Sequence, residues 1–237
     1  MNLLIPEIGH SNYNAFQMKE KLEQSGVDDV TILKDLFHSR YEHISCEQIT
    51  DEITECFDSH TNGEISNLVC HGTGCNIGLI LAKERASQIK TATFLSPKLE
   101  SASLIDKFSA FLYRYERIGY STTGSYYDHS LAENDILFNR IKYLRCERLI
   151  KRIASNCIDD IDYLNCLVMF ALGDASTSKI GAYKLAKHFS GRLFVSESVH
   201  CNFLLTDSSN KNSERALNVI SNYMNREKIL KKVNESR

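Results

Sequence analysis

The sequence has no tryptophan, two prolines, and only eleven glycines among its 237 residues. Average usage would supply glycine at roughly 7%, so the positions of these few glycines carry information. The charges nearly cancel, because the chain has 28 basic and 30 acidic residues. This balance argues against a nucleic-acid binder that works through bulk positive potential. Hydrophobic residues make up 43% and charged residues 24%, and this composition excludes disorder and fibrous repeats.

No long hydrophobic run is present. The longest apolar stretch, residues 164–173, has about ten residues, whereas a helix that crosses a bilayer needs about 20. The first residues, 1–7, have no basic region and too short an apolar run for a signal peptide. We therefore expect a cytoplasmic protein without a membrane span.

The eight cysteines form no CxxC pair, and several of them lie inside apolar segments. Reduced and mostly buried thiols are the better interpretation, in agreement with a cytosolic location. A zinc site is the alternative, because Cys70, His71 and Cys75 lie close together. Their spacing matches no zinc finger or ribbon, so we expect no metal ion and no other cofactor.

Short apolar runs and amphipathic segments alternate along most of the chain. Strands are predicted at residues 3–5, 30–33, 65–70, 91–95, 164–172 and 192–195. Helices are predicted at residues 14–24, 46–57, 76–88, 179–188 and 213–232. Strands that look buried on both faces and alternate with helices predict an α/β fold, with a mostly parallel central sheet and helices on both faces.

The segment 98–162 interrupts this alternation. It is polar and rich in tyrosine, and it predicts two or three helices around a loop at residues 119–129. We therefore expect a core made of residues 1–97 and 163–237, with a helical cap, residues 98–162, inserted after the fourth strand. Such a cap would lie over the carboxyl edge of the sheet, where ligands bind in open α/β folds.

The most specific feature is the junction between the third strand and the next helix, where residues 67–82 read NLVCHGTGCNIGLILA. Three of the eleven glycines, Gly72, Gly74 and Gly78, fall here within seven residues. A strand that turns sharply through small residues into a helix is the build of a nucleophile elbow. The segment resembles the elbow of the α/β-hydrolase family, which often reads G-H-S-x-G-G. Cys70 and Gly74 stand at the flanking small positions, and Gly72 stands where the family has its serine.

Two later segments resemble the rest of the family's catalytic triad, in the order nucleophile, acid, histidine. Residues 168–174, VMFALGD, resemble the strand that ends in the acid loop, with Asp174 at the acid position. Residues 193–200, LFVSESVH, resemble the last strand and its loop, with His200 at the histidine position. The 26 residues from Asp174 to His200 leave room for one helix and one strand, as the fold requires.

The same resemblance implies an oxyanion hole. Residues 5–11, IPEIGHS, resemble the loop that lends one backbone N–H to this hole, and Ile8 and Gly9 are the candidates. The other donor would be the N–H of Thr73, the residue after the elbow. The resemblance spans nearly the whole chain, is weakest across residues 98–162, and lacks two N-terminal strands that many members have. It implies a minimal α/β-hydrolase core with a helical cap.

Glycine at the elbow removes the attacking atom. In the family, a serine hydroxyl attacks an acyl carbon, the histidine takes its proton, and the acid fixes the histidine tautomer. Gly72 suits the turn, because the elbow residue is held at positive φ, which glycine adopts without strain. Nearby substitutes for the nucleophile are Thr73, Cys75, Cys70 and Ser11, and each fits the position poorly.

Three functions remain open. The one we favour is a catalytically impaired or non-hydrolytic protein that binds a small acyl- or ester-like ligand or a partner protein. The second is an enzyme in which His200 and Asp174 form a general-base pair that activates water or abstracts a substrate proton, as in lyase chemistry. The third is an ester or thioester hydrolase with an atypical nucleophile.

Both members of the possible pair also have structural explanations. His200 would be a loop histidine, and Asp174 a helix N-cap near Ser176 and Ser178. If the oxyanion hole and the pair are formed, a Gly72→Ser substitution is expected to give reactivity toward esters or a fluorophosphonate probe.

Overall fold

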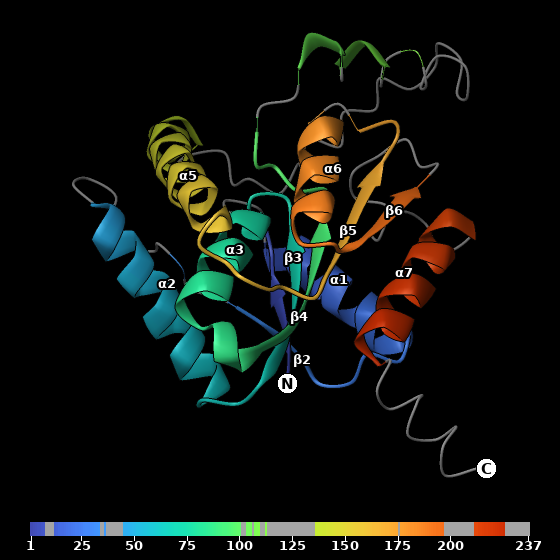
Figure 1. The fold of residues 1–237 in the computed structure, drawn as a ribbon, viewed down its shortest axis with the longest axis horizontal. Coiled ribbons are helices and arrows are strands. Elements are labelled where there is room, and N and C mark those ends of the chain that lie inside the picture. Colours follow the sequence, from blue (N-terminus) through green and yellow to red (C-terminus); the bar gives the residue numbers. More distant parts are fainter. Residues whose placement is uncertain are drawn as a thin grey trace.

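The structure, a computed structural model, describes residues 1–7, 12–33, 36, 45–100, 103–105, 107–109, 112, 136–174, 176–196 and 211–225. Its strands are β1 (Asn2–Ile5), β2 (Val30–Ile32), β3 (Ser66–His71), β4 (Ile89–Leu95), β5 (Cys166–Ala171) and β6 (Arg192–Ser196). Its helices are α1 (Asn12–Gln24), α2 (Cys46–Thr61), α3 (Gly74–Glu84), the 3₁₀ turn η1 (Ala86–Gln88), α5 (Ile136–Ile158), α6 (Lys179–His188) and α7 (Lys211–Met224). The strands form one sheet in the order β2-β1-β3-β4-β5-β6, and each neighbouring pair is parallel. The predicted α/β class with a parallel sheet is confirmed (Figure 1).

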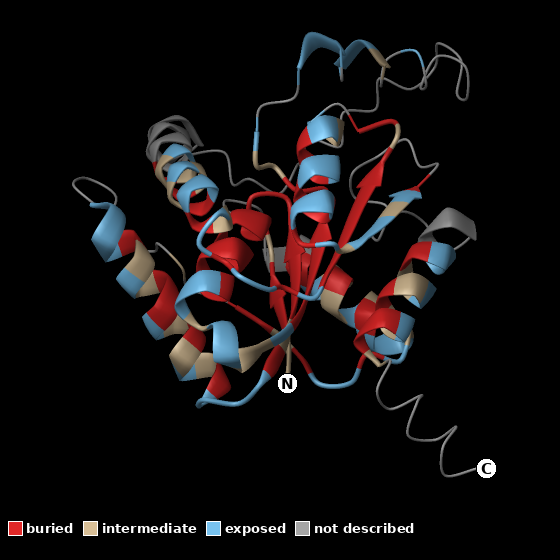
Figure 2. Ribbon diagram, viewed as in Figure 1, coloured by how far each residue is buried: buried red, intermediate tan, exposed pale blue. Residues whose placement is uncertain are grey.

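Helices cover both faces of the sheet, and an apolar core fills the space on each side (Figure 2). α1 and α7 cover one face, where they pack against side chains such as Leu4, Val69 and Met169. The helices α2, α3, α5 and α6 cover the other face, which carries Leu3 and Val168. Successive residues of a strand point to opposite faces, so strands covered on both faces need apolar residues at every position. This is why β5 is a continuous apolar run, CLVMFA, and why β4 keeps its polar residues mainly to the small side chains of Thr91 and Thr93.

The chain changes direction across the sheet between β1 and β3. From β1 it passes through α1 to β2 on one side, and through α2 it returns to β3 on the other side of β1. Open parallel sheets bind ligands at such a switch point, beyond the carboxyl ends of the strands. Ile5 lies beside Cys70, and Cys70 lies beside Phe94, in the register of the three central strands. The residues that follow β1, β3 and β4 therefore meet at one edge.

α5 lies within the segment predicted as a cap. Its C-terminal part brings Cys146, Ile150 and Ala154 into the same core as α3, so this part of the segment packs against α3 and α2. Earlier in the segment, Lys179 of α6 donates a hydrogen bond to the Ser109 hydroxyl at 2.6 Å. The tyrosine-rich loop at 119–129 lies outside the described residues, and the division into core and cap stays a prediction.

The predicted elements differ from the observed ones mainly at helix ends. α2 continues to Thr61 and ends at Asn62, which adopts a left-handed conformation with φ of 48°. The predicted helix 76–88 is α3 followed by η1, and the predicted helix 213–232 begins as α7, with residues 226–232 outside the described part of the chain. Among the described residues, no helix has the length and apolar character needed to cross a membrane.

Candidate functional site

Gly72 forms the turn between β3 and α3 with φ of +57°, as the sequence predicts. Its N–H donates to the carbonyl of Leu95 at 2.9 Å. Its carbonyl accepts from the N–H of Cys75 at 3.3 Å and from that of Lys98 at 3.2 Å. These bonds tie the turn to the end of β4 and to the first turn of α3, so position 72 is fixed at the carboxyl edge of the sheet.

Gly74 allows α3 to begin unusually close to the end of β1. An ideal Cβ at this position would lie 2.5 Å from the carbonyl oxygens of both Ile5 and Pro6. Because these are backbone atoms, they cannot turn aside, and only glycine fits. The close approach places Glu7, the residue after Pro6, directly at the elbow.

The carboxylate of Glu7 fills the space that a side chain at position 72 would need. An ideal Cβ on Gly72 would lie 2.7 Å from Cδ of Glu7, and 2.8 and 3.0 Å from its two oxygens. Glu7 is only 7% exposed, and it forms an ion pair with Lys98, which follows β4. A buried carboxylate is costly without a partner of opposite charge, and Lys98 supplies that partner. The space that a side chain at position 72 would need is thus taken by a carboxylate paired with an ammonium group.

Glu7 and Lys98 were not among the residues predicted for the site. The sequence carried a usable signal, because opposite charges lie within a few residues of the ends of β1 and β4, the two strands that flank β3. Parallel neighbours end at the same edge, so charges after these strands are expected to meet. The signal was obscured because Glu7 falls in the segment assigned to the oxyanion loop, and Lys98 is the first residue of the predicted cap.

Asp174 lies just beyond the carboxyl end of β5 and is 2% exposed. Its Oδ1 accepts hydrogen bonds from the N–H and the hydroxyl of Ser176 at 2.8 and 2.7 Å, and its Oδ2 accepts from the hydroxyl of Thr177. The N-cap of α6 is Ser178, whose hydroxyl accepts from the N–H of Gly181 at 3.0 Å. The interpretation of Asp174 as a helix N-cap is therefore wrong, and its carboxylate organises the loop that leads to the cap.

The other predicted site residues divide into two groups. Thr73 is the N-cap residue of α3 and is 2% exposed, without a side-chain capping bond. His200, Ile8, Gly9 and Ser11 lie outside the described residues. The contact between His200 and Asp174 and the oxyanion hole accordingly stay predictions.

Solved structures match nearly the whole chain. A monoacylglycerol lipase from Paleococcus ferrophilus has a TM-score of 0.62 at 15% identity, covering 94% of this chain and 92% of that one. A soluble variant of monoglyceride lipase from Saccharomyces cerevisiae has a TM-score of 0.60 at 10% identity, covering 95% and 87%. An alpha/beta hydrolase enzyme, MGS-MChE2, from the metagenome of sediments of the Mar Chica lagoon in Morocco, has a TM-score of 0.60 at 10% identity, covering 96% and 90%. The chain has the α/β-hydrolase fold.

No protein-family profile and no curated protein matches the sequence. Identities of 15% and below establish the α/β-hydrolase fold alone. The same fold carries many functions, so the activity of this chain has to be argued from its own residues.

Two cysteines, Cys70 and Cys75, lie at the turn between β3 and α3 of this α/β-hydrolase fold. Cys70 and Cys75 are both fully buried, and the thiol of Cys75 donates to the carbonyls of Cys70 at 3.3 Å and of Leu95 at 3.6 Å. Burial raises the pKa of each thiol well above its usual value. Because the thiolate is the nucleophilic form, burial disfavours both cysteines as the atypical nucleophile considered from the sequence. Among the described residues, no group of three or more His, Cys, Asp or Glu side chains could hold a metal ion.

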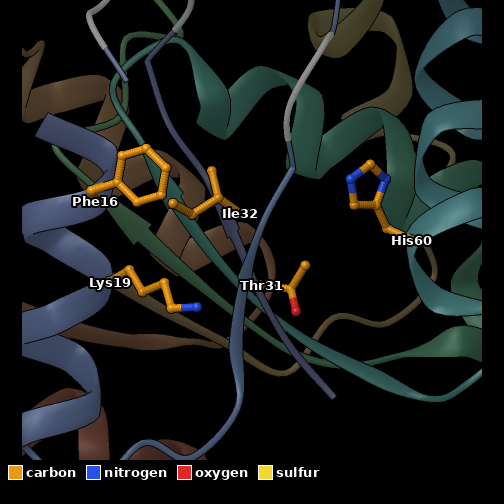
Figure 3. Close-up of a pocket in the computed structure, with 5 residues that line it drawn as sticks. All are labelled: Phe16, Lys19, Thr31, Ile32 and His60. Atoms are coloured by element: carbon orange, nitrogen blue, oxygen red, sulfur yellow. The ribbon is translucent and has the colours of Figure 1, made fainter. Parts of the chain in front are cut away.

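Two open cavities lie far from the elbow, along the β2 edge. One, of about 230 Å³, is lined by Phe16, Lys19, Thr31, Ile32 and His60 (Figure 3). The other, of about 380 Å³, is lined by Met1, Asp29, Thr31, His60, Thr61, Asn62 and Glu64. Met1, Asp29 and Glu64 precede β1, β2 and β3, so the second cavity lies at the amino ends of the strands. The crevice that ligands use in this fold is at the opposite ends.

Proposed function

We propose that this protein is a non-hydrolytic member of the α/β-hydrolase fold, which binds a small acyl- or ester-like ligand without forming a covalent intermediate. The observation that carries the proposal is the carboxylate of Glu7, which lies 2.7 Å from the point where a Cβ at position 72 would be. Gly72 removes the attacking hydroxyl, and Glu7 occupies the space in which a water molecule could have replaced it.

The negative charge of Glu7 also disfavours acyl transfer, the reaction that serine hydrolases of this fold catalyse. Acyl transfer builds negative charge on the carbonyl oxygen, and hydrolases stabilise it with positioned donors. A carboxylate at the attack position would bring a second negative charge close to this developing one. Lys98 pairs with the carboxylate, which reduces its strength as a nucleophile or base. Loss of the triad in serine hydrolases leaves only about 10³–10⁴-fold acceleration over water, and the Glu7 charge would reduce it further.

The sheet topology supports ligand binding. The chain keeps the switch point between β1 and β3, and sheets of this architecture take their ligands beyond the carboxyl ends of the strands at such a point. An acyl- or ester-like ligand is the class that the fold suggests by analogy, and a partner protein is the alternative for the same surface.

The test uses the complete chain with short p-nitrophenyl esters and a fluorophosphonate probe. We expect no turnover above background and no labelling, together with a saturable rise in melting temperature on addition of hexyl acetate as an ester probe. Glu7→Gln serves as a matched variant, because it keeps the shape and removes the charge. Robust turnover by the unmodified protein that is lost in Glu7→Gln or Asp174→Asn would overturn the proposal.

A second candidate is general-base chemistry by Asp174 and His200. The observation that favours it is the buried Asp174 carboxylate, held in one orientation by Ser176 and Thr177 beyond β5. Such a carboxylate could orient a histidine in the tautomer that accepts a proton. This candidate predicts exchange of acidic C–H protons of a bound ester with deuterium from solvent, and loss of that exchange in Asp174→Asn.

A further inference from the structure

Glu7 and Lys98 place a hydrogen-bond acceptor and a hydrogen-bond donor side by side at the carboxyl edge of the sheet. Nζ of Lys98 donates to Oε1 of Glu7, and the two residues lie just beyond β1 and β4, the strands on either side of β3. A carboxylate only accepts hydrogen bonds and an ammonium group only donates them, so the two adjacent groups are opposite in kind. The ammonium has three N–H groups and the carboxylate has two oxygens, so the bond between them exhausts neither group.

The pair lies at the position from which an elbow side chain would reach a ligand. An ideal Cβ on Gly72 would be 2.8 and 3.0 Å from the two oxygens of Glu7, and the residue at the tip of an elbow points to the ligand in this fold. The side chain of Lys98 is 22% exposed, and that of Glu7 is 7% exposed. A group that binds at this edge therefore contacts Lys98 from outside and reaches the Glu7 carboxylate next to it.

The backbone of Lys98 is held from two sides. Its N–H donates to the carbonyl of Gly72 at 3.2 Å, and its carbonyl accepts from Nδ2 of Asn76 at 3.3 Å. Asn76 belongs to the first turn of α3, and its Nδ2 also donates to the carbonyl of Thr73 at 3.3 Å. A group that is fixed before binding loses less conformational entropy when a ligand binds. The ion pair and these backbone bonds together pre-organise the Lys98 donor beside the Glu7 acceptor.

Asn76 adds a buried acceptor to the same edge. The residue is fully buried, and its Oδ1 has no hydrogen-bond partner in the part of the chain that the structure describes. The two bonds from Nδ2 to backbone carbonyls fix the orientation of the amide, so the unpartnered atom is the oxygen. Buried acceptors are normally satisfied. An occupant that brings N–H groups to this edge is therefore favoured over one that brings acceptors alone.

We propose that the ligand bound at this edge carries a primary carboxamide, whose carbonyl accepts from Lys98 and whose N–H donates to Glu7. In a primary amide, the carbonyl and one N–H point to the same side of the group, so both can meet a donor and an acceptor that are adjacent. A secondary amide in its trans form directs its carbonyl and N–H to opposite sides. This assignment rests on the proposed function, because it names the class of acyl ligand for the same site.

Other acyl groups match only half of the pair. An ester or a ketone has an acceptor for Lys98 but no donor for Glu7, so it would cover the carboxylate without returning a hydrogen bond. A carboxylate ligand would bring a second negative charge beside Glu7, and like charges in contact oppose binding. A methyl ketone is the sharpest comparison, because a methyl group of similar size replaces the amide nitrogen and its hydrogens.

The first experiment compares hexanamide with methyl pentyl ketone on the complete chain, with dissociation constants taken from the rise in melting temperature with ligand concentration. We expect hexanamide to bind at least roughly tenfold more tightly, because the ketone lacks the hydrogen bond to a charged group. N-methylhexanamide is expected to bind as weakly as the ketone. If the ketone or hexanoate binds as tightly as hexanamide, the carboxamide assignment is wrong and the proposed ligand binding stands. If none of these compounds and no hexyl acetate binds, both are wrong.

The second experiment tests the role of Glu7. Glu7→Gln keeps the shape of the side chain, but it replaces the carboxylate with a weaker acceptor that can also donate to a ketone. The preference for hexanamide over the ketone should therefore fall by at least roughly threefold. The control is Glu64→Gln, the same change at an exposed residue before β3, at the opposite ends of the strands; it should leave the preference unchanged. An unchanged preference in Glu7→Gln would overturn the assignment, and the ligand comparison on the unmodified protein tests it even if this variant does not fold.

Discussion

Glu7 and Gly72 share one small volume at the carboxyl edge of the sheet. The glycine has no side chain, and the glutamate carboxylate occupies the space in which one would lie. Lys98 keeps this carboxylate in place from the end of β4. The sequence led to Gly72, because the elbow pattern is local and contiguous. It did not lead to Glu7, because the meeting of Glu7 with Gly72 depends on the approach of β1 to α3, which involves residues distant in the chain.

The shared volume changes the expected result of restoring a serine. Gly72→Ser alone should stay unlabelled by a fluorophosphonate, because its Cβ would lie 2.7 Å from Cδ of Glu7, and burial and the ion pair with Lys98 hold that side chain in place. Strain at positive φ and overpacking should together lower the free energy of unfolding by about 2 kcal/mol. The double variant Gly72→Ser/Glu7→Gly should recover part of this loss, and it is the variant in which labelling is expected.

Urea denaturation of the two single variants and the double variant forms a cycle that isolates the coupling between the positions. Glu7→Gly alone is the control, since it removes the carboxylate without adding a nucleophile. If the two substitutions changed stability independently, the claim that side chains at positions 7 and 72 compete for one space would be wrong. Equal labelling of Gly72→Ser and of the double variant would contradict the expectation that the Glu7 carboxylate prevents a serine at position 72 from reacting.

At the scale of elements, periodicity determined what the sequence could predict. All six strands were anticipated within a few residues, since apolar runs bounded by polar segments are visible one strand at a time. α5 was anticipated only as part of a cap. Its buried residues recur at helical spacing, with Cys146, Ile150, Ala154 and Cys157 on one face, but the polar, tyrosine-rich context obscured that face. Which helices cover which side of the sheet is a tertiary property, and it required the structure.

One ion pair joins two of these elements. Arg85, after α3, donates to Asp58 of α2 from Nε to Oδ1 at 2.9 Å and from Nη2 to Oδ2 at 2.7 Å. The hydrogen bond from Arg85 lowers the pKa of Asp58 below its ordinary value of 3.8. A lowered pKa in the folded state means that the pair stabilises the protein above the unfolded value and that this stabilisation is lost as the pH falls through the folded value.

We expect Asp58→Asn to lower the free energy of unfolding by less than about 1 kcal/mol at neutral pH, because the pair is partly exposed. The difference from the unmodified protein should shrink as the pH falls below 3.8. Urea denaturation across a pH series measures it. Asp51→Asn, on an exposed position of the same helix, is the control. If the difference in the free energy of unfolding between Asp58→Asn and the unmodified protein grew as the pH fell, the predicted direction of the pH dependence would be wrong.

At the scale of the whole molecule, the sheet order predicts how stability is distributed. β1, β3, β4 and β5 have bonded neighbours on both sides and apolar cores on both faces. Amides in such strands open only in large unfolding events, whereas edges open locally. The sequence could predict the strands but not this order, because the order depends on where each crossover returns.

Hydrogen exchange followed by mass spectrometry tests this distribution. We expect peptides from β3 and β4 to exchange slowest and those from β2 to exchange faster, since β2 has a bonded neighbour on one side. Equal protection of β2 and β3 would contradict the sheet order.

The contact between Glu7 and position 72 also limits the paths by which this sequence can evolve. A first mutation to serine at position 72 meets the carboxylate, and a first mutation at Glu7 deprives Lys98 of its counterion without supplying a nucleophile. Either single substitution is expected to lower stability, so a serine at position 72 and the loss of the Glu7 carboxylate are expected to be tolerated best together. Positions 7 and 72 are therefore expected to change together rather than one at a time.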